Sequence, residues 1–452
     1  MDGGTIAALS TPSGRGGIAV IRVSGDLTRT IIKKIIEGVS EKIIDRKAVH
    51  SFIKDSDKRI EECVYTFFKS PNSYTGEDVV EISVHSNPFL SEAVLNLIFI
   101  NGAREALPGE FTYRAFKNGK IDLIQAESVN ELINANSRYY AEMKFGNLEG
   151  KLSAFLKDLK NEIVNLAVKI ESIIEFQEDQ SLERIEFTPE LESSIAGLNR
   201  IISGFRFNEV LDKGLRVVIV GKANVGKSSL FNSLLLEDRS ITSPIPGTTR
   251  DFIRERIFVE GYPVELTDVA GINSESADDI EKLGISRSLD LVKESDAVIF
   301  LLDGSSDIDE NDRKIFKLIK GKKQVVFINK SDNMKDGIAE TAASEFNIER
   351  ISRLSVLKNI GLEKVYSFIS SVINDIGEER AEISVNLRQK NLLAGIFHSL
   401  TNVKKMISAE KTNIELIAEE VRSCVTNIGK LMGEVASEDI LGKIFSDFCI
   451  GK

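Results

Sequence analysis

The spacing of apolar residues divides the chain into three kinds of segment. Up to about residue 118, the short runs 18–23 and 79–84 predict strands, and the apolar periods over 27–36 and 90–100 predict helices. From residue 121 the pattern becomes helical. Apolar residues then recur at alternating steps of four and three, which predicts one long helix with a buried stripe. The stripe consists of Leu152, Leu156, Leu159, Ile163, Leu166, Ile170 and Ile173.

A second stripe with the same rhythm runs from Ile414 to Leu431, and a strand–helix alternation lies between the two. Each stripe must bury its face, and the simplest partner for each is the other. We therefore expect an α/β domain inserted into a helical domain, although two independent helical pairs around a linker domain are the alternative. The predicted domains are an α+β domain over 1–118, a helical domain over 119–213 and 377–452, and an α/β domain over 214–376.

The composition is that of an ordinary globular protein, and a chain of 452 residues is too long for a single hydrophobic core. The net charge of −11 means that any contact with nucleic acid needs a local basic patch. Three distant cysteines, Cys63, Cys424 and Cys449, make no disulfide framework, and Cys424 fits the buried stripe. No export signal and no apolar run of membrane-spanning length is visible, so a cytoplasmic protein without a membrane partner is expected.

A phosphate-binding loop follows the first strand of the α/β segment. The strand-like run 215–220 leads into Gly221–Ser228, which has the pattern G-x-x-x-x-G-K-S, and a helix follows. The glycines let backbone N–H groups approach phosphate oxygens at a helix N-terminus. Lys227 would reach the β- and γ-phosphates, and Ser228 would ligate Mg²⁺. The predicted contacts here are Asn224, Val225, Gly226, Lys227, Ser228 and Ser229.

Further nucleotide-binding residues follow the next strands. Asp268 ends the strand-like run 264–267 and can hold the Mg²⁺ shell, while the amide of Gly271 can sense the γ-phosphate. A threonine of the segment 247–251 can complete the Mg²⁺ shell, and Thr249 is the predicted ligand. These elements occur in the order that a P-loop nucleotide site requires.

The base-reading motif Asn329-Lys330-Ser331-Asp332 follows a buried-type strand at 325–328. Asp332 can accept both the ring N–H and the exocyclic amine of guanine, whereas adenine would leave it unpaired. The motif in this position predicts GTP rather than ATP. Ser355 and Val356 lie where a backbone amide could meet the guanine O6.

The water-orienting group is not obvious. Ras-like GTPases place a glutamine directly after the Asp-x-x-Gly glycine, but here Ile272 takes that position. Acidic residues of the following loop can substitute for it, and they are Glu275, Asp278, Asp279 and Glu281.

The chain resembles the MnmE (TrmE) family of tRNA-modification GTPases over nearly its whole length. Four motifs carry the resemblance: T-I-A-A with G-R-G-G-I near the start, S-Y-T-G-E-D at 73–78, P-G-E-F-T with R-A-F and N-G-K between 108 and 120, and F-C-I-G-K at 448–452. It departs from the family at Ser86 and Asn87, where the family has two glycines.

The resemblance implies a folate-binding, dimer-forming N-terminal domain. Arg22, Glu81, Lys120 and Lys452 match the positions that bind a tetrahydrofolate derivative, either 5-formyl- or 5,10-methylene-tetrahydrofolate. Cys449 matches a cysteine proposed to act near the modification chemistry.

The resemblance also implies a potassium-activated mechanism. Asn224, Ser243, Ile245 and Thr248 match the K⁺-holding positions, and Glu281 matches the water-orienting glutamate. Thr248 and Ser243 thereby join the predicted GTP contacts. The family function would be the installation of an aminomethyl or carboxymethylaminomethyl group at carbon 5 of the tRNA wobble uridine. The homodimer would act with FAD-dependent MnmG as a heterotetramer.

Two other functions stay open from the residues. One is a ribosome-assembly GTPase that binds rRNA as a switch, which would be expected to carry a basic C-terminal RNA-binding domain. The other is a GTP-gated folate-binding module without modification activity, which Ser86 and Asn87 suggest.

Overall fold

The computed structural model describes residues 3–40, 42–176, 187–239, 254–268, 290–348, 351–377, 383–408 and 413–452. Contacts divide the chain into two compact units. The first unit comprises Met1–Asn134, Lys144–Ala196 and Leu387–Lys452, and the second comprises Ala135–Met143 and Gly197–Asn386. An α/β unit is thus inserted into a unit formed by the two ends of the chain.

The N-terminal part of the first unit is a mixed sheet with helices. Its strands are ordered β3-β4-β5-β2-β1-β6, and all neighbours are antiparallel except β1 and β6. The predicted strands and helices of this region are confirmed. The elements are β1 (Ile6–Leu9), β2 (Gly16–Ser24), α1 (Thr28–Ile35), β3 (Ala48–Asp55), β4 (Lys58–Phe68), β5 (Val79–Ser86), α2 (Pro88–Ile100), β6 (Arg104–Glu105) and α3 (Glu110–Lys117).

Alternation along β2 gives this sheet two different faces. Ile21 and Val23 point into a core with α1 and α2, because successive side chains of a strand point to opposite faces. Arg22 lies between them in sequence and pairs in register with Ala8 on β1 and Glu81 on β5. The second face therefore carries charged side chains.

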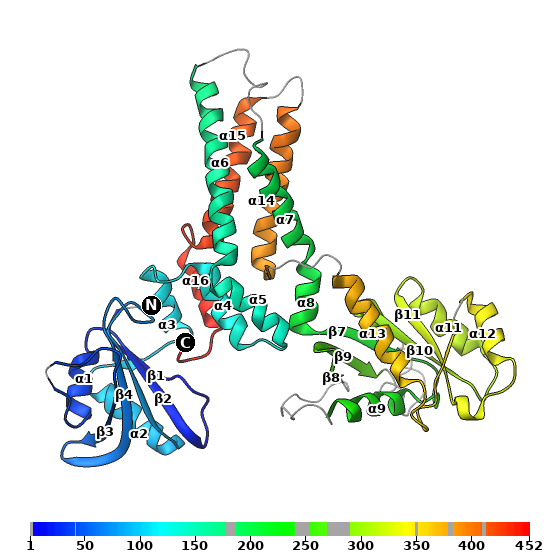
Figure 1. Cartoon of the computed structure of the whole chain (residues 1–452), viewed down its shortest axis with the longest axis horizontal. Helices are drawn as coiled ribbons and strands as arrows, with labels where there is room; N and C mark the ends of the chain where they lie inside the picture. The colour runs from blue at the N-terminus through cyan, green and yellow to red at the C-terminus, as the bar shows by residue number, and fades with distance from the viewer. Residues whose placement is uncertain are drawn as a thin grey trace. The chain divides into compact units, whose positions relative to one another are not determined.

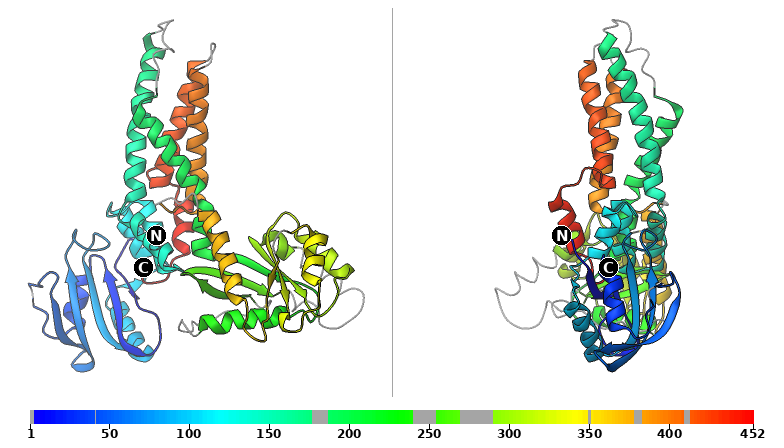
Figure 2. Two further views of the ribbon diagram at one scale, coloured as in Figure 1. Left: turned by 45° about the vertical axis from the view of Figure 1, so that its right-hand side comes forward. Right: turned by 90° about the vertical axis from the view of Figure 1, so that its left-hand side faces the viewer.

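The helical part of the first unit confirms the predicted pairing of the two apolar stripes. In Figures 1 and 2, α6, α14 and α15 run side by side, and α15 contacts both of the others. The stripe residues from Leu152 to Ile170 are buried. The helices of this part are α4 (Leu123–Ile133), α6 (Lys151–Phe176), α14 (Leu387–Ile407), α15 (Ile414–Met432) and α16 (Glu438–Ser446). The residues of α5 (Arg138–Leu148) and α7 (Pro189–Ser203) are divided between the two units.

The second unit is a mostly parallel sheet with helices on both faces. Its order is β12-β11-β10-β7-β9-β8, with only the β8–β9 pair antiparallel. Strands buried on both faces read as continuous apolar runs, as β7 and β10 do. The elements are α8 (Phe205–Lys213), β7 (Leu215–Val220), α9 (Lys227–Arg239), β8 (Arg254–Val259), β9 (Tyr262–Asp268), β10 (Ala297–Asp303), α11 (Glu310–Ile319), β11 (Lys323–Asn329), a 3₁₀ turn (Ser331–Asn333), α12 (Ile338–Phe346), β12 (Ser352–Arg353) and α13 (Leu362–Ile376).

Two apolar layers cover this sheet. Side chains of α8, α9 and α13 fill one layer, and those of α11 and α12 fill the other. In an open parallel sheet, ligands bind beyond the carboxyl ends of the strands. The carboxyl ends of β7, β9, β10 and β11 therefore bring the described nucleotide-binding residues to one edge.

Candidate nucleotide and folate sites

The phosphate loop of the second unit joins β7 to α9. The Nζ atom of Lys227 donates to the carbonyl oxygens of Gly221 and Lys222, each at 2.7 Å. Burial lowers the pKa of Lys227, and the nearby Asp268 carboxylate acts in the opposite direction. Asp268 is itself buried at the end of β9. The cation predicted for phosphate binding and the carboxylate predicted for the Mg²⁺ shell are therefore brought together.

Asn329 ties the phosphate loop to the loop after β12. Its Nδ2 atom donates to the Val225 carbonyl at 2.7 Å, and its Oδ1 atom accepts from the Val356 amide at 3.2 Å. A Cβ atom at Gly226 would lie 2.3 Å from that Nδ2, and the φ of Gly226 is +101°. Glycine is therefore required where the asparagine crosses the loop.

Asp332 lies at the same edge as an exposed carboxylate. The hydroxyl of buried Ser355 donates to its Oδ1 atom at 2.5 Å. That hydrogen bond is the main cause that holds the pKa of Asp332 below its ordinary value. Ser355 therefore orients an ionised carboxylate, which is the form that can accept two guanine N–H groups.

Two further predicted contacts have partners of their own. Lys330 has a left-handed backbone with φ of 60°, and its Nζ atom donates to Asp303 at 2.7 Å. The Val356 amide, predicted to meet the guanine O6, donates to Asn329 instead. Asp303 was not predicted from the sequence, although its place at the end of a buried strand is a signal that could have indicated it.

A pair of aspartates was also missed. The Nζ atom of Lys222 lies 3.2 Å from Asp309 and 3.1 Å from Asp312. These aspartates form the capping box at the start of α11. Lys222 thereby fixes the phosphate loop to a neighbouring helix. The D-x-x-D spacing before an apolar helix was the available signal.

The remaining predicted residues fall into two groups. Asn224, Ser228 and Ser229 are exposed on the phosphate loop and the first turn of α9, and Asn224 has a φ of 62°. Oxygen atoms of Ser228 and Asp268 suit a hard cation such as Mg²⁺. The other six lie outside the described residues, and they are Ser243, Ile245, Thr248, Thr249, Gly271 and Glu281.

A separate charged site lies on the second face of the N-terminal sheet. Nε and Nη2 of Arg22 donate to Oε1 of Glu81 at 3.0 and 2.8 Å, and Nη1 donates to the carbonyl of Gly451 at 3.4 Å. Burial lowers the pKa of Lys452 and Arg22 lowers it further, whereas Glu81 and Cys449 act in the opposite direction. We call Arg22, Glu81, Gly451 and Lys452 the Arg22 site.

Aromatic rings border this site. The guanidinium carbon of Arg22 lies 5.3 Å from the ring centroid of Tyr74 and 5.6 Å from that of Phe111. A guanidinium, a carboxylate and aromatic faces are groups that fit a pterin and its glutamate tail. Lys120, the fourth predicted residue, is exposed and donates to the Pro71 carbonyl at 3.0 Å, so it is not gathered with the others.

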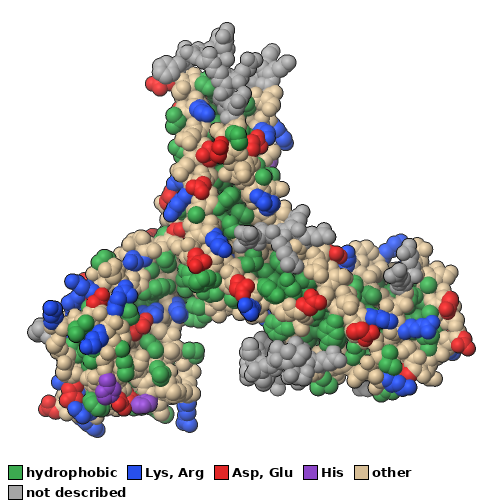
Figure 3. All heavy atoms as spheres, viewed as in Figure 1, with side chains coloured by type: hydrophobic (Ala, Val, Ile, Leu, Met, Phe, Trp, Pro, Cys, Tyr) green, Lys and Arg blue, Asp and Glu red, His purple; other side chains and the backbone are tan. Residues whose placement is uncertain are grey.

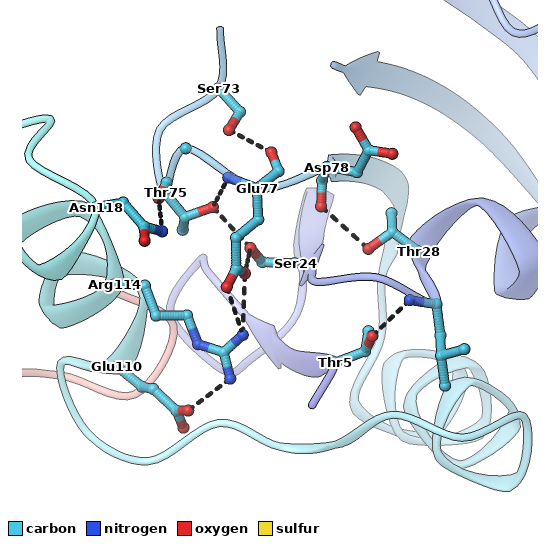
Figure 4. Close-up of polar contacts among 12 residues, drawn as sticks. Thr5, Ser24, Thr28, Ser73, Thr75, Glu77, Asp78, Glu110, Arg114 and Asn118 are labelled. Atoms are coloured by element: carbon cyan, nitrogen blue, oxygen red, sulfur yellow. Dashed lines mark hydrogen bonds and ion pairs between the residues drawn. The ribbon is translucent and has the colours of Figure 1, made fainter. Parts of the chain in front are cut away.

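An ionic network beneath α3 was not predicted. Arg114 donates to both carboxylate oxygens of Glu77 and to Glu110, and Ser24 donates to Glu77 at 2.7 Å (Figure 4). Glu110 also accepts two hydrogen bonds from Arg104. Burial alone would raise the pKa of Glu110, but hydrogen bonds from Arg104, the Leu107 amide and Arg114 hold it below its ordinary value. This network fixes α3 against the sheet.

The three cysteines differ in environment. Cys63 and Cys424 are buried, whereas Cys449 is exposed. Burial raises the pKa of each of the two buried thiols to about 12. The predicted core position of Cys424 is confirmed, and Cys449 is the one thiol of the three that faces solvent.

The fold and the first of these sites define the class of protein. A G-x-x-x-x-G-K-S loop between a parallel strand and a helix, with Asn329 and Asp332 at the same edge, is the arrangement of a P-loop GTPase. Family models described as "GTP-binding protein TrmE N-terminus" and "MnmE helical domain" match residues 5–120 and 123–449. The chain belongs to the MnmE family of tRNA modification GTPases.

Individual relatives extend over the full length. The chain is 39% identical over 450 residues to the tRNA modification GTPase MnmE of Thermotoga petrophila, covering 99% of this chain and 100% of that protein. It is 38% identical to MnmE of Aquifex aeolicus, covering 99% of each. A crystal structure of Aquifex aeolicus Era bound to GDP.AlF4− is 26% identical, covers 41% of this chain and 66% of that chain, and has a TM-score of 0.29.

Two surface properties complete the description. Within the described residues, no helix has both the length and the apolar character that crossing a bilayer requires. On the face drawn in Figure 3, Lys and Arg side chains alternate with Asp and Glu side chains over the helical bundle. The described residues of that face therefore form no continuous basic surface for a phosphate backbone.

Proposed function

We propose that this chain is a potassium-activated GTPase that installs the aminomethyl or carboxymethylaminomethyl group at carbon 5 of the tRNA wobble uridine. The observation that carries the proposal is the presence of two sites in one chain that matches MnmE over its full length: a phosphate loop with Asp332 at the same sheet edge, and the Arg22 site. Its partner is the FAD-dependent MnmG, and a homodimer is the working unit. The cytoplasm, where tRNA is modified, is its proposed location.

Residues of the nucleotide site have separate tasks. Lys227 neutralises charge on the β- and γ-phosphates, and Ser228, Thr249 and Asp268 hold Mg²⁺ directly or through its water shell. Asp332 selects guanine. Asn224, Ser243, Ile245 and Thr248 hold K⁺, and Glu281 orients the attacking water. Bound K⁺ supplies positive charge that can stand in for an arginine finger.

The Arg22 site binds the one-carbon carrier. Arg22 and Lys452 attract the carboxylates of the folate tail, and Glu81 accepts from the donor edge of the pterin. Lys120, which is exposed and donates to the Pro71 carbonyl, would reach the bound ligand from outside the Arg22 site. A bound methylene-tetrahydrofolate would supply the one-carbon unit. Cys449 lies in the same short segment as Lys452 and acts near that chemistry.

Wobble-nucleoside analysis tests the proposed function. Cells that lack this chain should lose the 5-aminomethyl-type nucleosides, and a plasmid copy should restore them. A chain carrying Asp332→Asn, which should not hold GTP well, is the matched control and should not restore them. Unchanged wobble nucleosides in the deletion strain would refute the proposal and favour the rRNA-binding switch.

Potassium dependence is a second, independent prediction. Because Ile272 cannot orient water and Asn224 is exposed on the phosphate loop, hydrolysis should need an additional cation. Replacing Na⁺ by K⁺ at constant ionic strength should raise the GTP hydrolysis rate about tenfold or more, as expected for a charge placed at the transition state. Equal rates in both salts would remove K⁺ from the mechanism.

A folate-binding module without modification activity is the second candidate, and Ser86 motivates it. The family has a glycine in place of Ser86, and the Ser86 hydroxyl donates to the Gly14 carbonyl at 3.0 Å. Titration with formyl-tetrahydrofolate distinguishes the two. Tight binding and normal GTP hydrolysis without a tRNA product would favour the module.

A further inference from the structure

The segment Cys449–Lys452 is held by residues from the beginning of the chain. The Ser10 hydroxyl donates to the Gly451 carbonyl at 3.0 Å, and Nη1 of Arg22 reaches the same oxygen at 3.4 Å. Backbone amides at the start of α3 complete the attachment. Gly109 donates to the Cys449 carbonyl at 3.4 Å, and Phe111 donates to the Lys452 carbonyl at 3.2 Å.

Close packing of the backbone reinforces these bonds. Gly451 has a φ of +95°, and a Cβ atom there would lie 2.3 Å from the Leu9 carbonyl oxygen. Only glycine can approach strand β1 this closely. This packing restricts the backbone around Gly451, and the hydrogen bonds to its carbonyl restrict it further.

Ser10 differs from the other groups that hold the segment. Arg22 also engages Glu81, and the Gly109 and Phe111 contacts are made by the backbone. The side chain of Ser10 contacts the segment through one hydroxyl hydrogen bond, while its backbone amide donates to the Val20 carbonyl at 2.8 Å. Its hydroxyl can therefore be removed without disturbing the pairing of the strand end.

We propose that Ser10 is a positioning residue of the Arg22 site. Through the Gly451 carbonyl, its hydroxyl holds the terminal segment so that the Lys452 amine stays near Arg22, Glu81 and Cys449, and it keeps that carbonyl on the guanidinium. This inference rests on the proposed function for its catalytic consequence, whereas its structural part can be tested without any tRNA reaction.

Thiol labelling tests the structural part. Because Cys63 and Cys424 are buried, a methanethiosulfonate nitroxide added to the native protein reports on Cys449. In Ser10→Ala the nitroxide should move faster than in the wild type, and Ser10→Thr, which keeps a hydroxyl, should restore the slower motion. Ser446→Ala is the matched control, since the Ser446 hydroxyl bonds only within α16, to the Lys443 carbonyl at 2.8 Å.

Steady-state kinetics with unlabelled protein test the functional part. Loss of one hydrogen bond predicts that kcat for tRNA modification falls about fivefold in Ser10→Ala, with the KM for tRNA and the GTP hydrolysis rate unchanged. Ser10→Thr should recover most of kcat. Equal nitroxide motion in Ser10→Ala and wild type, or an unchanged kcat, overturns the proposal. If the wild type itself modifies no tRNA, the proposed function fails, and the nitroxide comparison still decides whether Ser10 positions the segment.

Discussion

The nucleotide site and the Arg22 site are built in different ways. In the nucleotide site, each functional group follows a strand of one parallel sheet, and a neutral amide, Asn329, links two loops. In the Arg22 site, Arg22 and Gly451 meet although 429 positions separate them. Charged pairs hold that assembly, and the network of Glu77, Glu110 and Arg114 supports it.

The difference matches the ligands that we propose for the two sites. A triphosphate is bound mainly by backbone N–H groups, which a short loop and a helix N-terminus provide. A folate offers a flat ring and a remote carboxylate tail, so its recognition needs side chains gathered from several elements. The nucleotide site should therefore tolerate distant changes, whereas the Arg22 site should be sensitive to anything that moves its short terminal segment.

The largest effect is expected at the phosphate loop. Lys227→Ala should reduce GTP hydrolysis about a thousandfold, because the charge on the β- and γ-phosphates loses its buried counter-ion. Radiolabelled phosphate release measures the rate. Lys320→Ala, at an exposed position of the same unit, should retain the wild-type rate. A rate loss below tenfold in Lys227→Ala would contradict this assignment of the phosphate site.

Base selection should show the next largest effect. Asp332→Asn should weaken GTP binding about a hundredfold, because an amide cannot accept both guanine donors. The same variant should gain affinity for xanthosine triphosphate, which presents an acceptor in that place. Competition against a fluorescent guanine nucleotide gives both affinities. Retained preference for GTP would exclude Asp332 from base reading.

A smaller effect is expected at the Arg22 site. Arg22→Met keeps an aliphatic stem but removes the guanidinium, and affinity for formyl-tetrahydrofolate should fall about thirtyfold, as for loss of a charge-assisted hydrogen bond. Isothermal calorimetry measures it. Arg59→Met, which removes an exposed guanidinium paired with Glu37 on the same domain, should leave the affinity unchanged. Equal affinities of the two variants for formyl-tetrahydrofolate would show that Arg22 takes no part in folate binding.

The smallest effect concerns the pH dependence of stability. Since the folded pKa of Glu110 lies below its ordinary value of 4.5, its ionised form stabilises the fold above that pH, and this contribution disappears as the pH falls through the folded pKa. Glu110→Gln should lower the free energy of unfolding at pH 7 by about 1.5 kcal/mol. The difference in the free energy of unfolding between Glu110→Gln and the wild type should become smaller as the pH falls toward about 3.

Urea unfolding followed by far-ultraviolet circular dichroism measures that free energy at each pH. Glu92→Gln, on α2 of the same unit and exposed, is the control. A difference between Glu110→Gln and wild type that grows as the pH falls would contradict the direction of the shift.

The elements and the phosphate loop were predictable because their signals are local. A strand, a glycine-rich turn and a helix stand next to one another in residues 215–239, and each stripe on α6 and α15 has its own period. The assembly of the Arg22 site had no local signal. Ser10 and Arg22 reach Gly451 only when the two ends of the chain meet, and Arg114 reaches Glu77 across 37 positions. The periodicity of a single chain carries no information about such contacts.

The packing of residues 135–143 could not be predicted from the sequence for the same reason. Tyr139 stacks on Tyr262 with ring centroids 4.9 Å apart, and the Ser137 hydroxyl donates to the Leu211 carbonyl. Residues 135–143 thereby pack with the α/β unit, although their sequence continues a helical pattern. The residues of α5 are divided between the two units, but the apolar period of the sequence shows no break at that point.

Reconstitution of the reaction tests the central claim most directly. The purified chain would be mixed with the FAD-dependent partner proposed for it, unmodified tRNA, methylene-tetrahydrofolate, NADH, an amine donor and K⁺. Separate mixtures would contain GTP, ATP or a non-hydrolysable GTP analogue. The account predicts that 5-aminomethyl-type wobble uridine forms in the mixture with GTP and in neither of the other two. Equal product with ATP, or product without any hydrolysable nucleotide, would contradict it.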